Sequence, residues 1–467
     1  MLRLVLAAVI AALPAAISGD AQAQRFTPSF NSVGPRGPSM PPNIGPRGPR
    51  FDRPHFTIQT TLSDPDAVVD PEPVRRAKKK KPGGGGSIAG GMPPAGENRF
   101  VPDEVVIQMS GDPEPVARRL RLVRMERLDL GLTGQTLYRW RIPDGRSVRE
   151  VIRELGAIGV YSQPNYRFEG VQQEQAANAP GAAPQEGDPA QYVLAKLHVA
   201  AAHRLAKGEK VLVAVIDSGV DATHPELAGV IAGTFDAVSS GEPHAHGTAV
   251  AGAIAAHSRL QGVAPSAHIL AVRAFGASGS GAEGTTFNIL KGIDWAAGQG
   301  ARIFNMSFAG PADPGLARAM AAAHQRGIVL IAAAGNAGAK SPPLFPAADP
   351  NVIAVSATDA EDRLFEASNR GPYIAIAAPG VDILLPAPGG AYQVLSGTSF
   401  AAAHVSGIAA LILERRPDLK PDAVRRILVG AAKDLGPKGR DPQFGAGLAD
   451  AYRSLTTLDA SASAASR

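Results

Sequence analysis

The sequence predicts an α/β protein with a doubly wound, mostly parallel sheet, preceded by a small α+β domain and a disordered linker. Between residues 189 and 455, apolar runs of strand length recur at 211–216, 268–272, 303–306, 328–333, 352–355 and 374–377. Because these runs are continuous rather than alternating, they indicate strands buried on both faces. Stretches with helical periodicity separate several of them, at 285–297, 314–326 and 399–415. Alternating strands and helices are typical of a parallel sheet, in which ligands bind beyond the carboxyl ends of the strands.

Composition excludes several classes of protein. The 467 residues suffice for more than one domain, and 45% hydrophobic with 19% charged residues suits a globular chain. The formal net charge of +5 lies mostly in the first 190 residues, so the charge of the larger C-terminal part does not indicate a nucleic-acid partner. The chain has no cysteine, which excludes disulfides, thiolate metal sites and cysteine nucleophiles.

The N-terminal residues are typical of a signal peptide. Arg3 precedes an apolar run over residues 4–17, and Ala-Gln-Ala at 21–23 is a small-x-small cleavage site. We therefore expect a signal peptide over residues 1–23, cut before Gln24, and export to the periplasm or the medium. The run is too short to favour a stable membrane anchor.

The next segments differ in composition. Residues 24–98 are rich in Pro, Gly and Lys without apolar periodicity, which predicts a disordered, solvated linker. Residues 99–170 predict the small α+β domain, with strands at 101–108, 137–142 and 160–168 and helices at 115–123 and 147–155. An exposed connector over residues 171–188 then leads to the main domain over residues 189–455. Residues 456–467 are expected to form a flexible tail.

Four polar residues of the main domain are candidates for chemistry. Asp217 ends a predicted buried strand, His246 opens a helix of small residues, and Ser399 begins a long apolar helix. Asn336 follows a fourth segment, a buried strand that runs into Gly-Asn-Ala-Gly. Each residue alone has an ordinary structural explanation, as a turn former or a helix cap. Together they offer a carboxylate to orient an imidazole, an imidazole, a hydroxyl and an amide donor.

A metal site is a weaker interpretation of the same region. His244 and His246 form an H-x-H pair, but no third ligand stands at a usual spacing and the chain has no H-E-x-x-H motif. No metal and no cofactor are therefore expected.

The motifs around these residues resemble those of the subtilisin-like serine proteases, the subtilases. The resemblance covers residues 191–452 and includes VAVIDSGVDATHPEL, HGTAVAGAIAA, GVAPSAHILAVRAF, FNMSFAG, AAAGNAG and GTSFAAAHVSGIAALIL. It implies peptide-bond hydrolysis in which Ser399 attacks the carbonyl, His246 transfers the proton and Asp217 holds the imidazole. Asn336 and the backbone N–H of Ser399 would bind the oxyanion.

The resemblance also implies where the substrate lies. Its backbone would add as a strand between two segments, Gly279-Ser280-Gly281 and Ser307-Phe308-Ala309. Leu344 matches a position near the floor of the main specificity pocket, where glycine leaves the pocket deep. We expect Leu344 to shorten that pocket and to favour small or medium apolar side chains before the scissile bond.

A small α+β domain ahead of a subtilase domain resembles an inhibitory, folding-assisting propeptide. Self-cleavage within residues 172–188 would remove it, leaving a monomer whose partners are protein or peptide substrates and its own propeptide. Phe400 and Ala403 depart from the Met and Pro usual in the serine motif, but neither removes a catalytic group. The short segment AHSRLQ lacks the longer Asn-rich loop that binds calcium in many relatives, so that calcium site is not expected.

Other classes of function leave more of the sequence unexplained. Residues 279–284 match the dinucleotide motif G-x-G-x-x-G, but residues 301–308 supply no acid for a ribose. An α/β-hydrolase is disfavoured because no G-x-S-x-G occurs. A catalytically inactive, secreted subtilase-like binding scaffold is the remaining alternative.

Overall fold

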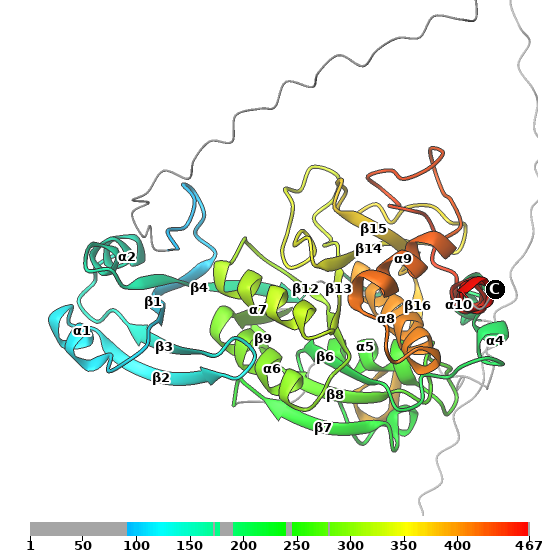
Figure 1. Ribbon diagram of the computed structural model, residues 1–467, viewed down its shortest axis with the longest axis horizontal. Helices are drawn as coiled ribbons and strands as arrows, with labels where there is room; N and C mark the ends of the chain where they lie inside the picture. The colour runs from blue at the N-terminus through cyan, green and yellow to red at the C-terminus, as the bar shows by residue number, and fades with distance from the viewer. Residues whose placement is uncertain (1–90, 171–172, 178–189, 240–244, 279–280, 466–467) are drawn as a thin grey trace, which may run out of the picture. The chain divides into compact units, whose positions relative to one another are not determined.

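A computed structural model describes residues 91–170, 173–177, 190–239, 245–278 and 281–465. The expected signal peptide and most of the expected linker lie outside these residues. Residues 81–467 form one compact unit. Within it we distinguish an N-terminal subdomain, residues 91–170, from a C-terminal subdomain, residues 190–465 (Figure 1).

The C-terminal subdomain is built on a seven-stranded sheet in which every neighbouring pair is parallel. In spatial order its strands are β15 (Ile374–Pro379), β14 (Val352–Thr358), β13 (Val329–Ala333), β11 (Ile303–Met306), β6 (Leu212–Asp217), β8 (His268–Arg273) and β7 (Ile231–Asp236). The predicted parallel sheet is confirmed, with six strands where the apolar runs placed them. The seventh strand, β7, was not predicted, because its residues alternate between half-buried and exposed at the sheet edge.

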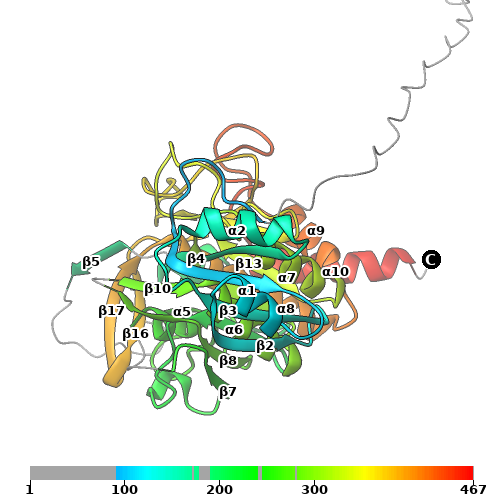
Figure 2. The ribbon, with the colours of Figure 1, turned by 90° about the vertical axis from the view of Figure 1, so that its left-hand side faces the viewer.

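Helices cover both faces of this sheet, as doubly wound folds require (Figures 1 and 2). Val213 and Val215 of β6 join the core cluster that contains α5 (Ala245–Ala255) and α8 (Thr398–Arg415). The alternate residues Ala214 and Ile216 join the opposite cluster, with α6 (Thr286–Gly298) and α7 (Pro314–Gln325). The first cluster also takes in α3 (Tyr192–Lys196), α4 (Val199–Ala202), α9 (Pro421–Ala431) and α10 (Ala451–Ala465).

The strand order places the end of β6 at a special position. β6 lies between β8 and β11, which follow it in the chain on opposite sides. The strand order therefore reverses beside β6, and such a switch point opens a crevice at the carboxyl ends of the strands. Asp217 is the last residue of β6.

The N-terminal subdomain is an antiparallel sheet in the order β2-β3-β1-β4, with two helices. Its elements are β1 (Phe100–Gln108), α1 (Glu114–Arg119), β2 (Val123–Leu130), β3 (Gln135–Arg141), α2 (Val148–Ala157) and β4 (Tyr161–Gly170). Ile107, Trp140 and Leu155 are fully buried where α2 packs on the sheet.

The helix predicted over 115–123 ends early, at Arg119, and the chain turns into β2 through Arg121 at φ 52°. β2 was not predicted, because an exposed edge strand carries a polar sequence.

Strand pairing also connects segments far apart in the chain. β4 extends the N-terminal sheet by pairing with β10 (Gly281–Thr285), which pairs with β9 (Phe275–Ser278), and with β12 (Phe308–Ala309). A third sheet contains β16 (Ile383–Ala387), β17 (Ala391–Ser396) and β5 (Gln173–Ala177). Two short 3₁₀ helices, Pro225–Leu227 and Pro388–Gly390, complete the described elements.

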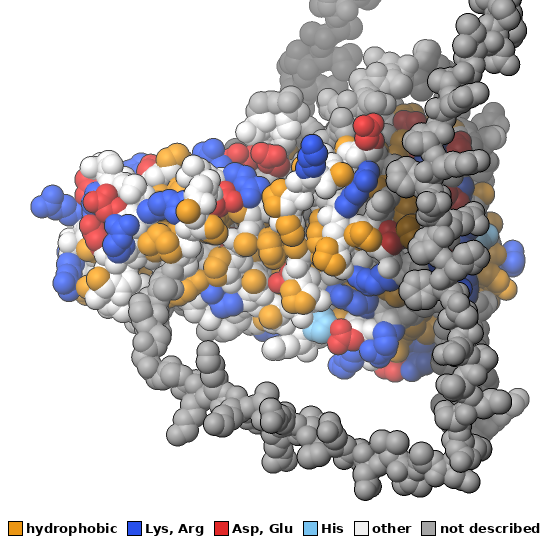
Figure 3. Space-filling model, turned by 90° about the horizontal axis from the view of Figure 1, so that it is seen from above, with side chains coloured by type: hydrophobic (Ala, Val, Ile, Leu, Met, Phe, Trp, Pro, Cys, Tyr) orange, Lys and Arg blue, Asp and Glu red, His pale blue; other side chains and the backbone are white. Residues whose placement is uncertain are grey.

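β5 falls within the expected connector, and α10 spans most of the expected C-terminal tail. Leu455 and Leu458 of α10 bury against the core, which explains why a helix replaces the tail there. None of the helices in the described ranges is long and apolar enough to cross a bilayer. On the face seen in Figure 3, positive and negative side chains are interspersed.

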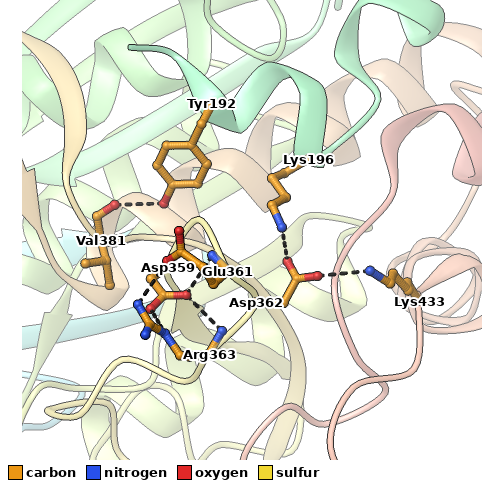
Figure 4. A network of polar contacts seen from close by, with 8 residues as sticks. All are labelled: Tyr192, Lys196, Asp359, Glu361, Asp362, Arg363, Val381 and Lys433. Atoms are coloured by element: carbon orange, nitrogen blue, oxygen red, sulfur yellow. Dashed lines mark hydrogen bonds and ion pairs between the residues drawn. The ribbon is translucent and has the colours of Figure 1, made fainter. Parts of the chain in front are cut away.

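A polar network anchors the start of the C-terminal subdomain (Figure 4). Asp362 accepts hydrogen bonds from Lys196 of α3 at 2.7 Å and from Lys433 at 2.9 Å. Burial raises the pKa of Asp362, but these two hydrogen bonds outweigh it and hold the pKa below its ordinary value. The hydroxyl of Tyr192 donates to the carbonyl of Val381 at 2.7 Å. These contacts tie α3 to loops from the other end of the subdomain.

A buried carboxylate holds the short loop that follows α5. Glu226 is fully buried and accepts the backbone N–H groups of Ser258, Arg259 and Leu260 at 2.9–3.0 Å. The hydroxyl of Tyr392 donates to the same carboxylate at 2.8 Å. Burial, and then this hydrogen bond, raise the pKa of Tyr392 to about 12, so the hydroxyl stays a donor. Calcium needs six to eight oxygen ligands, whereas this carboxylate faces N–H and O–H donors. The carboxylate of Glu226 is therefore occupied by hydrogen-bond donors rather than presented to a cation.

We expect Glu226→Gln to lower the free energy of unfolding by about 3 kcal/mol. A neutral amide weakens the charge-assisted hydrogen bonds, and its own N–H group would face the backbone N–H donors of the loop. Denaturant unfolding in a Ser399→Ala background, which would exclude self-digestion, measures the loss. Glu361→Gln, in an exposed loop, is the control. A loss that added calcium restores would contradict the assignment of this loop to a hydrogen-bonded carboxylate.

The buried His404 of α8 predicts a pH-dependent stability. Burial lowers its pKa from 6.5 to about 4, although the hydrogen bond between Nδ1 and the carbonyl of Pro379 opposes the shift. The neutral ring's contribution is therefore complete above pH 6.5 and is lost as the pH falls to about 4, by roughly 3 kcal/mol. Unfolding free energies of His404→Gln should vary less across this window than those of the Ser399→Ala parent. His268→Gln, at an exposed position, should keep the parent's slope; an unchanged slope in His404→Gln would refute the assignment.

Candidate active site

Asp217 and His246 form a buried pair at the carboxyl end of β6. Asp217 Oδ1 lies 2.8 Å from Nδ1 of His246, and the two residues are 4% and 2% exposed. The backbone N–H and hydroxyl of Ser218 donate to the same oxygen at 2.7 and 3.0 Å. Because an ionised carboxylate only accepts, Nδ1 carries the proton in this pair. The imidazole is thereby held in one tautomer, with Nε2 as the basic nitrogen.

Glycines bring the helix that carries His246 close to β6. A Cβ on Gly247 would lie 2.0 Å from the carbonyl oxygen of Gly219, closer than any real contact. The backbone N–H of Gly247 donates to the hydroxyl of Ser218 at 3.3 Å. The small-residue pattern of α5 thus places the imidazole in the helix's first turn against Asp217.

Ser399 lies in the first turn of α8, beside this pair. The next residue, Phe400, is fully buried, with its ring centroid 5.8 Å from that of His246. The hydroxyl of Ser307 donates to the carbonyl of Ser399 at 3.2 Å. A serine at this end of a helix faces unpaired backbone N–H groups and the positive end of the helix dipole.

Asn336 reaches the same helix start from the loop after β13. Its Oδ1 accepts the backbone N–H of Thr398 at 3.1 Å and the Thr398 hydroxyl at 2.9 Å. These two donors fix the orientation of the amide. Among the described residues, the buried Nδ2 has no hydrogen-bond partner. A donor held in this way is suited to bind a developing oxyanion.

The four candidate residues are therefore brought together, from segments up to 182 positions apart in the chain. Two of the expected substrate-binding residues, Phe308 and Ala309, pair with a strand of the chain itself. β4 lies antiparallel between β12, where Gly170 faces Phe308 and Glu169 faces Ala309, and β10. Ser307 directly precedes β12.

On the β10 side, β4 pairs with Glu283, Gly284 and Thr285. Gly281, another expected substrate-binding residue, pairs with Ser278 within the β9–β10 hairpin. Gly279 and Ser280 lie outside the described residues. Sequence reasoning missed Glu283, since the register that selects it depends on this hairpin.

A cavity of about 580 Å³ adjoins β4. Leu344 lines it together with Ala309, Gly310 and Asn336 from the C-terminal subdomain. Backbone hydrogen bonds of 2.9 and 3.0 Å between Gly310 and Phe345 connect the segment after β12 to the segment that carries Leu344. The predicted pocket residue thus lies beside the predicted oxyanion donor, while its effect on specificity stays a prediction.

Metal and dinucleotide sites fit this region less well. Within the ranges that the structure describes, no group of three or more His, Cys, Asp or Glu residues could hold a metal ion, and His244 lies outside them. The G-x-G-x-x-G segment contributes Gly281 and Gly284 to β10. A dinucleotide motif requires instead a glycine-rich loop that leads from a strand into a helix.

Comparisons with known proteins agree with this geometry. The peptidase S8 family model, the subtilase family, matches residues 208–447. Subtilisin Savinase of Lederbergia lenta is 38% identical over 268 residues, which are 55% of this chain and 96% of that protein. Thermitase of Thermoactinomyces vulgaris is 39% identical over 231 residues, 48% of this chain and 81% of that protein.

Among solved structures, fervidolysin from Fervidobacterium pennivorans, a keratinolytic enzyme related to subtilisin, is similar with a TM-score of 0.66 and 27% identity. That match covers 76% of this chain and 61% of the fervidolysin chain. The structure has the parallel sheet with the Asp217–His246 pair at its switch point, and the family model spans half of the chain. The chain therefore belongs to the subtilase family.

Proposed function

We propose that this protein is an exported serine endopeptidase, made as a precursor, with Asp217, His246 and Ser399 as its catalytic triad. The observation that carries the proposal is the buried hydrogen bond between Asp217 and His246, beside the start of α8, in a member of the subtilase family. Protein or peptide substrates are the class that this chemistry implies.

In the proposed mechanism, Ser399 Oγ attacks the carbonyl carbon of the scissile bond while His246 Nε2 takes the hydroxyl proton. His246 then gives this proton to the leaving amine, and an acyl-enzyme forms. Water, deprotonated by His246, attacks the acyl carbon, and His246 returns that proton to Ser399 Oγ as it leaves, which releases the acid product. Asp217 keeps the proton on Nδ1 and stabilises the imidazolium. Asn336 Nδ2 and the N–H of Ser399 donate to the oxyanion.

Residues 91–170 would act as the inhibitory propeptide. β4 occupies the strand position that a substrate would take between β10 and β12. A second set of contacts lies at the starts of α6 and α7. Gln163 donates to the fully buried Asp313 at 2.7 Å, and Asn165 accepts the backbone N–H of Phe287 at 3.1 Å. Burial raises the pKa of Asp313 despite its four hydrogen bonds. Because β4 ends at Gly170, self-cleavage would fall early in residues 172–188.

We expect Ser399→Ala to abolish both labelling by a fluorophosphonate probe and the shortening of the N terminus, because one hydroxyl performs both reactions. Mass spectrometry of the two purified proteins measures the N termini. The same shortened N terminus in Ser399→Ala would argue against self-processing. A wild-type protein that no probe labels would favour the inactive scaffold.

Asn336→Ala should lower kcat by roughly 10²–10³-fold with a smaller change in KM, as removal of one oxyanion donor does in subtilisin. Peptide hydrolysis under saturating and subsaturating substrate separates the two constants. Thr398→Val is the matched control, because it loses the hydroxyl's hydrogen bonds to Asn336 and to the N–H of Gly335 but keeps Nδ2. If Thr398→Val were as impaired as Asn336→Ala, the effect would come from loop geometry rather than from the donor.

A further inference from the structure

We propose that Glu283 makes this peptidase select a basic side chain in the bound substrate strand, at the position that Arg167 holds in β4. The inference rests on the proposed function, because it takes β4 as the stand-in for substrate. It deepens that function by naming a class of substrate.

The register of β4 is fixed by a buried aromatic side chain. Phe168 is fully buried and packs edge-on against Phe308, with ring centroids 5.9 Å apart. In the pairing with β10, Phe168 faces Gly284, and on the other side a Cβ added to Gly310 would lie 2.3 Å from the Phe168 ring. The close fit of the ring against Gly310 and Phe308 holds one alignment of β4.

This register places the charged neighbours of Phe168 on the opposite face of β4. Side chains alternate along a strand, so Arg167 and Glu169 point away from the buried ring. Both line the 580 Å³ cavity, as does Glu283. Arg167 Nε lies 3.4 Å from a carboxylate oxygen of Glu283, and the two side chains are 41% and 31% exposed.

Once the N-terminal subdomain has left, Glu283 determines the sign of the charge in the cavity. The charged lining residues Arg99, Arg167 and Glu169 belong to the N-terminal subdomain and would leave with it. Of the described lining residues that the C-terminal subdomain contributes, Glu283 is the one with a charge. A substrate strand in the emptied position therefore meets a single carboxylate.

The same carboxylate disfavours acidic side chains. Glu169 lies directly opposite Glu283 in the register, and like charges opposite each other destabilise a strand pair. In the precursor, Arg99 attracts Glu169 and so opposes this repulsion. The pKa of Arg99 is raised, first by its hydrogen bond to Glu97 and also by its attraction to Glu169. A peptide substrate brings no such arginine.

The test uses the mature enzyme and internally quenched peptides that copy residues 165–174, with Arg, Gln or Glu at position 167. Phe168 and Gly170 are kept in every peptide to preserve the register. For the wild type we expect kcat/KM to be about two- to fivefold higher with Arg than with Gln, the size of a partly exposed ion pair, and lower again with Glu. The ratio should shrink as salt is added.

Variants of the cleft residue assign the effect. Glu283→Gln should give equal rates with the Arg and Gln peptides, and Glu283→Lys should reverse the order of the Arg and Glu peptides. Asp418→Asn removes an exposed acidic residue outside the cavity, and it should keep the wild-type order.

Two outcomes overturn the inference while leaving the peptidase intact: equal wild-type rates with all three peptides, or an Arg preference that survives in Glu283→Gln. A wild type that cleaves none of the peptides and takes up no fluorophosphonate probe would instead overturn the proposed function itself.

Discussion

The hydrogen bond between Asp217 and His246 is the contact on which the geometry of the site depends. It joins the end of a central parallel strand to the first turn of α5, and it forms only because Gly247, which lacks a Cβ, lets its backbone approach the carbonyl of Gly219. A buried carboxylate without partners would be costly, so three donors converge on one oxygen of Asp217. The sheet determines where the Asp217–His246 pair lies, and Gly247 allows the short distance between the two side chains. Any side chain at residue 247 would separate the pair.

Most of the main sheet could be predicted from sequence because its strands are buried on both faces. A short continuous apolar run such as 328–333, in a chain where such runs alternate with helices, fits a strand that is covered on both faces. The candidate site followed from the same logic, since Asp217 and Asn336 stand where such strands end. Ser399 and His246 were found because each begins a helix of small or apolar residues. Their convergence depends on strand order, which apolar periodicity alone does not determine.

The missed features share a different physical cause. β2 and β7 lie at sheet edges, where one side faces water and the sequence looks like a loop. Glu283 acquires its partner through a hairpin register, and Glu226 acquires its donors from a loop more than 30 residues away. For both glutamates, the interaction partners come from a segment distant in sequence. The residue type alone predicts only an exposed position for these glutamates.

The proposed precursor must release its own inhibitor, and the contacts of β4 bear on how it does so. Under the proposed function, a cut after β4 leaves intact both its pairing with β10 and β12 and the polar contacts at the starts of α6 and α7. Cleavage of the chain is therefore not yet release. The cut makes rebinding bimolecular, so a dissociated propeptide no longer returns at the high effective concentration of a tethered segment. At one end of the pairing the like charges of Glu169 and Glu283 oppose each other, although Arg167 attracts Glu283, whereas Phe168 at its centre secures the alignment. Under the proposed function, an inhibitor that one buried ring aligns and one pair of like charges opposes can guide folding and still leave.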